Sequence, residues 1–256
     1  MENKITNSAM LADIKKDYIE KRKAFKRRIL VCGGAGCISS HCGEVQEALK
    51  MSLAEHQLES EVEILVTGCM GTCAAGPVLL VEPDGIFYTA MNPQKVADLV
   101  ERHLVHGEVC EEYTFYDTEE ERYIPKLDDI PFFKEQVRIA LRNCGRMEFA
   151  SIEAYIARDG YAAAAKALDH LSREEVVEIV KASGLRGRGG AGFPTGIKWE
   201  SGMKAVSEDG QKYMVCNADE GDPGAFMDRS ILEGDPHSII EGMMLGAYAI
   251  GADKGY

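Results

Sequence analysis

The chain has 256 residues, of which 45% are hydrophobic and 28% are charged, and its formal net charge is −13. That length allows one large domain or two ordinary ones. The surplus of carboxylates argues against a nucleic-acid partner, because contact with phosphates needs clustered cations. No segment approaches the ~20 consecutive apolar residues of a membrane span. We therefore expect a cytoplasmic protein without direct membrane insertion, whose eight cysteines stay reduced rather than forming disulfides.

Residues 1–27 are expected to form an N-terminal charged helix, centred on 11–25. This segment runs into the one dense group of basic residues in the sequence. We interpret the group as a solvated helix face rather than as a site for an anionic partner. It comprises Lys21, Arg22, Lys23, Lys26, Arg27 and Arg28.

Four cysteines form the most informative pattern, Cys32-x4-Cys37 and Cys69-x3-Cys73, and each pair lies in a loop of glycine and other small residues. Small residues let the backbone bend tightly and aim N–H groups at bound sulfurs. The spacings fit a two-iron cluster better than zinc knuckles, which more often read C-x2-C. A structural zinc site is the alternative.

The elements predicted around these cysteines follow the order β-α-β-β-β-α. They are strands over 29–31, 62–66, 78–81 and 86–89, and helices over 43–56 and 93–105. Pro83-Asp84-Gly85 supplies a hairpin turn, and Asn92-Pro93 supplies the start of a helix.

Together with the cysteine loops, this order resembles the thioredoxin-like [2Fe-2S] ferredoxin module of NADH dehydrogenases and NAD-dependent hydrogenases, over residues 28–107. The resemblance implies that a [2Fe-2S] cluster is bound by Cys32, Cys37, Cys69 and Cys73. Cys37-x4-Cys42 repeats the first spacing. A register in which Cys42 is a ligand therefore stays open as an alternative.

Residues 108–130 carry many carboxylates without a repeated apolar pattern, which predicts an acidic linker between two separately folding halves. Beyond the linker we expect helices over 131–143, 151–157 and 161–168. Ser172 and Glu175 form a capping-box pattern for another helix, which ends at Gly184. Cys144 is interpreted as a packed thiol, because no second cysteine lies near it in the sequence.

A glycine-rich run follows at 184–199. Such a bare loop lets backbone amides approach a phosphate or a flat ring. Gly187, Gly189 and Gly192 match G-x-G-x-x-G, but the preceding element is predicted to be a helix, whereas a Rossmann fingerprint follows a strand. The cations and aromatic rings interleaved with the glycines argue against a flexible linker. They are Arg186, Arg188, Phe193, Lys198 and Trp199.

A predicted strand over 212–216 then leads into Asn217-Ala218-Asp219-Glu220-Gly221-Asp222. Carboxylates at the C-terminal end of a strand lie where an open α/β sheet binds its ligand. They can accept hydrogen bonds from ribose hydroxyls, and an Asn amide can donate and accept at a flavin or nicotinamide edge. An ordinary polar turn is the alternative interpretation.

The segment from about 131 to 256 resembles the flavoprotein subunit of complex I-type NADH dehydrogenases. The motifs are Gly-Arg-Gly-Gly-Ala-Gly-Phe-Pro-Thr-Gly (187–196), Asn-Ala-Asp-Glu (217–220) and Glu-Gly-Asp-Pro-His (233–237), the last of which is the entry to an apolar helix expected over about 236–250. With the N-terminal module, the chain is most similar to the diaphorase subunit of NAD(P)-dependent iron hydrogenases; formate dehydrogenases carry related subunits. The implied fold is α/β: a thioredoxin-like [2Fe-2S] domain, then the N-terminal part of an FMN/NADH-binding domain.

That resemblance implies an NAD(P)H:acceptor oxidoreductase subunit, in which hydride passes between NAD(H) and FMN and electrons leave singly through iron-sulfur clusters. The resemblance implies that Glu220 and Asp222 lie near the reacting rings. Some relatives carry Glu at the position of Asp222. The implied cofactor-binding residues are Gly187, Arg188, Gly189, Gly190, Ala191, Gly192, Phe193, Gly196, Lys198, Asn217, Asp219 and Glu220.

The implied partners are other iron-sulfur subunits of a hydrogenase, formate dehydrogenase or NADH dehydrogenase complex, and ferredoxin. Family members continue into a region with a C-x2-C-x2-C motif for a [4Fe-4S] cluster, and this sequence contains no C-x2-C. We therefore expect a C-terminally truncated chain with an incomplete flavin site. The alternative is a stand-alone [2Fe-2S] electron carrier or redox sensor without flavin chemistry. The choice between NADH and NADPH, the terminal acceptor and the cluster potential are not encoded in these patterns.

Overall fold

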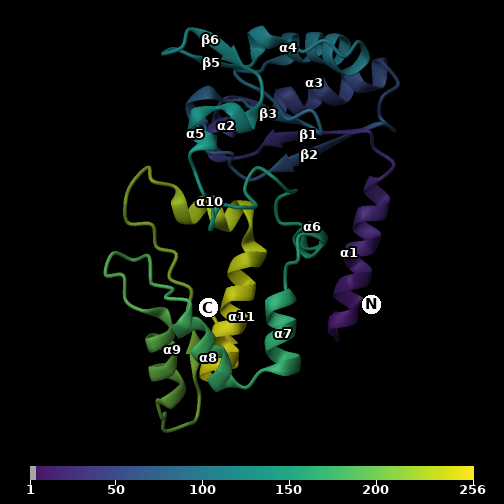
Figure 1. Cartoon of the computed structure of the whole chain (residues 1–256). Helices are drawn as coiled ribbons and strands as arrows, with labels where there is room; N and C mark the ends of the chain where they lie inside the picture. Colours follow the sequence, from purple (N-terminus) through teal and green to yellow (C-terminus); the bar gives the residue numbers. More distant parts are fainter. Residues whose placement is uncertain (1–3) are drawn as a thin grey trace.

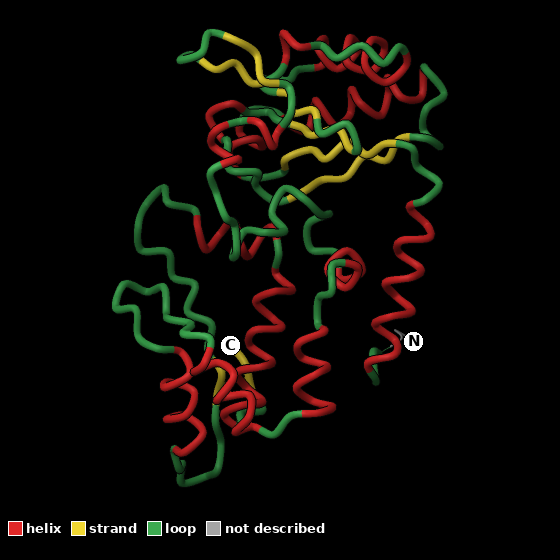
Figure 2. Tube along the Cα trace, viewed as in Figure 1, coloured by secondary structure: helices red, strands yellow, loops and turns green. Residues whose placement is uncertain are grey.

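The computed structural model describes residues 4–256, so the first three residues of the expected N-terminal segment lie outside it. The main sheet lies at one end of the molecule together with several helices, and the other end is mainly helical (Figures 1 and 2). The main sheet has the order β2-β1-β3-β4, with β1 and β2 parallel and the other neighbours antiparallel. Its strands are β1 (Arg27–Cys32), β2 (Val62–Thr67), β3 (Leu79–Glu82) and β4 (Ile86–Tyr88).

One face of this sheet is covered by helices. They are α3 (Cys42–Glu55) and α4 (Pro93–Asp98), which continues as a π-helical segment (Leu99–Val105). The short helix α2 (Ala35–Ser39) follows β1, and its Cys37 packs with Leu30 in the cluster on the other face. Side chains from alternate positions of β1, such as Ile29 and Val31, pack with Leu49 of α3 and Val96 of α4, and all four are buried. The Asn92 side chain accepts from the Lys95 N–H and caps α4, as its sequence predicts. The expected β-α-β-β-β-α order is therefore present.

The opposite face of the sheet is covered by the segment that the sequence predicts to be a linker. Residues 108–130 contain a hairpin of β5 (Phe115–Asp117) and β6 (Arg122–Ile124). Ile124, Leu127 and Ile130 are buried against Leu30 and Phe87 of the sheet. The prediction of an unpacked acidic linker is wrong in this respect: the carboxylates face solvent, while irregularly spaced apolar residues are buried.

A long helix is also wrongly predicted after this segment. Only α5 (Pro131–Lys134) is helical, and residues 135–150 are irregular. Val137 is 90% exposed and Ile139 is 75% exposed. Because neither apolar side chain finds a partner, no buried face stabilises a helix there.

The second half of the chain is mainly helical. Its elements are α6 (Ile152–Ala157), α7 (Ala162–His170), α8 (Arg173–Ala182), α9 (Thr195–Lys204), α10 (Met227–Gly234) and α11 (Pro236–Ile250), with the short strands β7 (Tyr213–Met214) and β8 (Lys254–Gly255). The Ser172 capping box of α8 is present. Helix α11 packs against α7, α8 and α9, so Ala249 and Val177 are buried next to Trp199. The sequence does not predict α9 and α10, and the strand expected over 212–216 has only two residues, paired in parallel with β8.

The two halves pack against each other rather than standing apart. Helix α1 (Ser8–Arg22) has no buried residue and contacts α6 and α7. The Phe149 N–H donates to the Val66 carbonyl at 3.1 Å, so the irregular segment lies along β2. Within residues 4–256, no helix is long and apolar enough to cross a bilayer.

Candidate functional site

The first cysteine pair is fixed by the end of β1 and by α2. Cys32 is the last residue of β1, and Cys37 lies inside α2 rather than in an open loop. Both residues are buried. The Gly33 N–H donates to the Thr67 carbonyl at 2.9 Å, which holds the start of this loop against the end of β2. The loops that follow the two parallel strands therefore lie at the same edge of the sheet.

The second pair lies directly against the first loop. A Cβ placed on Gly34 would lie 2.8 Å from the Cβ of Cys69, and one placed on Gly36 would lie 2.8 Å from the Cβ of Cys73. No larger residue fits at either glycine without displacing a cysteine. The sulfurs of Cys69 and Cys73 are 3.7 Å apart, and the Gly71 N–H donates to the Cys69 sulfur at 3.4 Å.

The thiols influence one another's ionisation. The neighbouring Cys37 thiol raises the pKa of Cys32 to about 11, and the Cys32 thiol in turn lowers the pKa of Cys37. The Cys32 thiol and burial raise the pKa of Cys69. Thiolates this close repel one another, so a bound cation would favour ionisation of all four thiols. Such a donor set fits a cationic iron-sulfur core held by four thiolates.

The four thiols come from two loops that face each other. Among residues 4–256, no group of three or more Cys, His, Asp and Glu side chains is already arranged to hold a metal ion. Facing thiol loops suit either a two-iron core or one tetrahedral zinc ion.

The other cysteines have ordinary packing contacts. Cys42 is buried in α3, and its sulfur accepts from the Gln46 side chain at 3.9 Å. Cys144 is buried, donates to the Ser230 carbonyl at 3.6 Å and lies against Gly234. Cys110 is buried against the π-helical segment.

The glycine-rich loop forms a second candidate site. The two ends of this loop are joined by a hydrogen bond in which the Gly187 N–H donates to the Phe193 carbonyl at 2.9 Å. A Cβ on Gly189 would meet nothing within 4 Å, and its φ is not positive, so internal packing gives no reason for glycine there. Phe193 is 54% exposed, and Lys198 on α9 is also exposed. A bare backbone beside an exposed ring and a cation fits a flat, phosphorylated group such as FMN.

Gly190, Ala191 and Gly192 lie at the tip of this loop and Gly196 lies at its base, where it is packed against α8. A Cβ on Gly196 would lie 2.6 Å from the Lys181 backbone nitrogen. This glycine therefore has a packing role in the helix pair α8 and α9. Arg188 folds back and donates to the Arg186 carbonyl at 2.8 Å.

The segment after β7 projects on the same side of the molecule as the glycine-rich loop (Figures 1 and 2). Asn217, Asp219 and Asp222 are exposed, and the Asn217 side chain accepts from the Asp219 N–H at 3.1 Å. Glu220 points back into the chain: its carboxylate accepts from the backbone N–H groups of Met227, Asp228 and Arg229. Glu220 therefore caps α10, a role that the sequence does not reveal.

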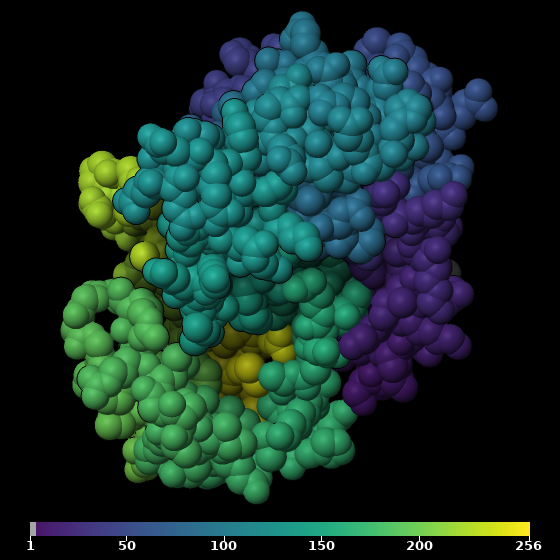
Figure 3. Space-filling view, turned by 45° about the horizontal axis from the view of Figure 1, so that its top comes forward, coloured from purple at the N-terminus to yellow at the C-terminus, as the bar shows by residue number. Residues whose placement is uncertain are grey.

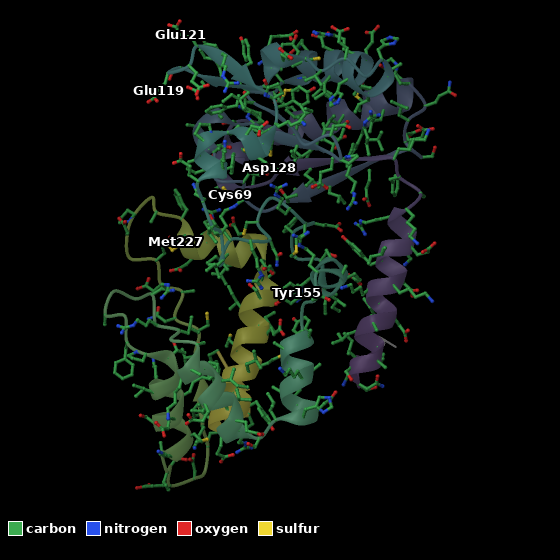
Figure 4. All side chains as sticks on the ribbon, viewed as in Figure 1. Cys69, Glu119, Glu121, Asp128, Tyr155 and Met227 are labelled. Carbon is green, nitrogen blue, oxygen red and sulfur yellow. The ribbon has the colours of Figure 1, made fainter. Side chains whose placement is uncertain are left out.

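Helix α10 connects the two candidate sites. Glu220 binds its N-terminus, and Gly234 at its end contacts Gly68, the residue before Cys69. Figure 4 labels Met227, at the start of α10, and Cys69. An eight-residue helix is about 12 Å long. No short-range sequence pattern relates Gly68 to Gly234, so the sequence alone could not reveal this connection.

Two family models match separate segments of this chain. Residues 17–104 match the family model of the thioredoxin-like [2Fe-2S] ferredoxins, and residues 180–256 match that of the Nuo51 FMN-binding domain.

The NADP-reducing hydrogenase subunit HndC of Solidesulfovibrio fructosivorans is 62% identical over 122 residues, which cover 48% of this chain and 24% of that protein. An NADH-quinone oxidoreductase subunit of Rhizobium meliloti is 52% identical over 118 residues, which cover 46% of this chain and 28% of that protein. The matched part thus spans about a quarter of these relatives. A crystal structure of the thioredoxin-like [2Fe-2S] ferredoxin from Aquifex aeolicus is 33% identical, with a TM-score of 0.33, over 35% of this chain and 96% of that chain.

The chain thus contains one segment that matches the thioredoxin-like [2Fe-2S] ferredoxin family and, after it, one that matches the Nuo51 FMN-binding domain family.

Proposed function

We propose that this chain is the [2Fe-2S]- and FMN-binding part of an NAD(P)H:acceptor oxidoreductase subunit. The observation that carries the proposal is that α10 contacts Glu220 at its N-terminus and Gly68, the neighbour of Cys69, at its end, so this helix links the 217–222 segment to the second cysteine loop. When bound, FMN accepts a hydride from a nicotinamide and passes electrons on singly. The protein's task is to position the two groups and to exclude water between them.

Each candidate residue has a proposed role. Cys32, Cys37, Cys69 and Cys73 are the proposed cluster ligands. The glycine-rich loop, residues 187–192, would offer backbone N–H groups to phosphate, while Phe193 and Lys198 flank the ring system. Asn217 and Asp219, exposed after β7, would donate to and accept from the flavin and ribose. Asp222 would face the nicotinamide, and Glu220 would hold this segment through its contact with α10.

The partners are proposed from the relatives: other iron-sulfur subunits of a hydrogenase, formate dehydrogenase or NADH dehydrogenase complex, or ferredoxin. The proposed location is the cytoplasm.

Metal and flavin analysis tests the cofactor part of this proposal. The chain is purified anaerobically, and its iron, sulfide, zinc and FMN are measured, with absorption spectra before and after dithionite. We expect two irons and two sulfides per chain, with a visible spectrum that bleaches on reduction. Zinc without visible absorption would contradict the redox function, and a cluster without flavin affinity would favour a stand-alone [2Fe-2S] carrier.

Serine variants test the ligand register. Cys32→Ser is expected to lose the cluster, whereas Cys42→Ser, with its sulfur on Gln46, is expected to keep it. The reverse result would assign Cys42 as the ligand. Cys110→Ser is the matched control, since this buried thiol lies away from both loops.

Activity is tested in the protein as isolated with its partner subunits, by NADH-dependent reduction of an artificial electron acceptor. Lys198→Ala is expected to lower the rate at least tenfold, because it removes an exposed cation from the proposed flavin site. Lys166→Ala, an exposed lysine on α7, is the matched control. Equal rates in both variants would overturn the assignment of Lys198.

A further inference from the structure

A cavity of about 380 Å³ lies between α1, the main sheet and α6, away from both sites described above. Its floor is apolar: Leu30 and Leu65 are paired neighbours on β1 and β2, and Met147 and Ala154 close the cavity from the second half of the chain. All four are buried. In the space-filling view, α1 (purple) lies against the sheet domain and the segment of α6 and α7 (Figure 3).

The walls of this cavity carry positive charge. Five of its lining residues are cations, and none of the described residues that line it is acidic. They are Arg22, Lys23, Arg28, Arg146 and Arg158. Three belong to the basic run near the N-terminus and two come from beyond residue 140, so the fold gathers cations that are far apart in a chain of net charge −13. Such a local excess of one sign attracts anions.

Two of these cations form no ion pair, although Glu63 and Glu82 are the strand neighbours of Arg28. Arg22 bonds to Glu63 and Glu148 at 3.1 and 3.2 Å, so this residue of the basic run is held in ion pairs rather than solvated. By contrast, no carboxylate within residues 4–256 lies within 4.0 Å of the Arg28 or Arg158 guanidinium. Arg158 is fixed by its Nε–H donating to Asn143 at 3.0 Å. That contact leaves its terminal N–H groups for another acceptor.

The cavity also has an aromatic edge. Phe25 lines it and also lines an adjoining cavity of about 440 Å³, with which it shares Arg28 and Arg146. The guanidinium of Arg22 covers one face of Tyr18, 3.7 Å from the ring centroid. An apolar floor with an aromatic edge and guanidinium groups outside ion pairs matches a ligand with a flat ring and phosphates. The volume lies within the ~300–1,000 Å³ of small-molecule sites.

We infer that this cavity binds a nucleoside phosphate, with its base on the floor of Leu30, Leu65 and Met147 and its phosphates at Arg28 and Arg158. The site is separate from the proposed flavin and nicotinamide residues, and it joins the [2Fe-2S] domain to α1 and α6. Binding there would stabilise the packing of the two halves.

Calorimetric titration of the purified chain with ADP tests this inference, with pyrophosphate as the probe that lacks a base. We expect ADP to bind at least tenfold more tightly than pyrophosphate, because the base adds apolar contact. Arg28→Ala and Arg158→Ala are each expected to weaken ADP binding at least tenfold, and Arg28→Lys to weaken it less. Both arginines are exposed, so these variants are expected to fold, which thermal unfolding verifies.

Two controls locate the binding. Arg122→Ala removes an exposed arginine of the β5–β6 hairpin that pairs with Glu120, and it is expected to leave ADP affinity unchanged. Arg188→Ala probes the glycine-rich loop, and a loss of ADP binding in this variant alone would place the ligand at the proposed flavin site instead. The inference is overturned if the wild-type chain does not bind ADP, if pyrophosphate binds equally well, or if Arg188→Ala alone abolishes binding.

Discussion

Gly68 and Gly234 touch through their backbones: a Cβ placed on Gly68 would lie 2.4 Å from the Cα of Gly234. Gly68 precedes Cys69, and Gly234 ends α10. From the other side, a Cβ on Gly234 would lie 2.8 Å from the Cys144 sulfur. Neither position has room for a side chain, so this contact sets the distance between the second cysteine loop and α10.

Gly68→Ala is therefore expected to destabilise the folded chain. An added methyl group in a filled space costs about 1–3 kcal/mol, measured as the free energy of unfolding in urea. Gly43→Ala, near the start of α3, is the matched control, because a Cβ there meets nothing within 4 Å. Equal stability of the two variants would show that the Gly68 contact yields without cost.

Gly34→Ala is expected to weaken cluster binding more than it weakens the fold. Its Cβ would lie 2.8 Å from the Cys69 Cβ and 3.2 Å from the Cys69 sulfur, so the proposed ligand must move. Displacing the support of a metal ligand typically lowers metal affinity about 10–100-fold. Iron retained per chain during titration with a chelator measures the effect, with Gly43→Ala again as the control. Wild-type iron retention in the Gly34 variant would argue against Cys69 as a ligand.

Local signals predicted the elements whose ends are fixed by neighbouring residues. The Asn92 side chain accepts from the Lys95 N–H at 2.9 Å, and the Ser172 and Glu175 capping box is formed as expected. Pro236 begins α11, where the Asp235 side chain accepts from the Ser238 N–H at 3.2 Å. In each case the groups that start the helix lie within three or four residues, so the sequence carries the whole signal.

Long-range packing decided the elements that were not predicted. The hairpin of β5 and β6 exists because Ile124 is buried on the main sheet, and residues 135–150 are not helical because Val137 and Ile139 find no partner. Long-range packing also decides the geometry of the cysteine site. The cysteine pairs are visible in the sequence, but the fit of Gly34 against Cys69 depends on how two separate loops meet.

Glu241→Ala is expected to be strongly destabilising. Glu241 is buried in α11 and accepts from the Tyr155 hydroxyl at 2.5 Å and from the backbone N–H groups of Tyr161 and Ala164 at 2.9 and 3.0 Å. Tyr155, labelled in Figure 4, ties α6 to this carboxylate. Loss of the Glu241 carboxylate leaves these buried donors without acceptors, which costs roughly 3 kcal/mol in unfolding free energy.

Two further variants separate this effect from loss of charge alone. Glu241→Gln keeps one acceptor oxygen and is expected to lose about half as much stability. Glu178→Ala removes an exposed carboxylate that pairs with Lys181, and it is expected to cost less than about 1 kcal/mol. A Glu241→Ala variant as stable as the Glu178→Ala variant would contradict the buried network.

His103 is expected to make the first domain less stable in mild acid. It is buried; its Nδ1 shares a hydrogen bond with the Tyr88 hydroxyl at 2.9 Å, and its Nε2 lies 3.2 Å from Asp84. Burial lowers the pKa of His103, although the Asp84 carboxylate opposes the shift. The neutral ring is therefore favoured in the folded chain, and the unfolded chain takes up a proton first as the pH falls below about 6.5. Stability from this group is fully present above that pH and is lost below it.

Urea unfolding at about pH 7.5 and pH 5.5 measures this loss, and each unit of pKa difference contributes about 1.4 kcal/mol. In His103→Gln the titrating group is gone while a neutral polar side chain remains next to Tyr88 and Asp84. The variant is expected to be less stable than wild type at the higher pH but to lose less stability on acidification. The same pH dependence in both proteins would assign the acid sensitivity to other groups, because only His103 differs between them.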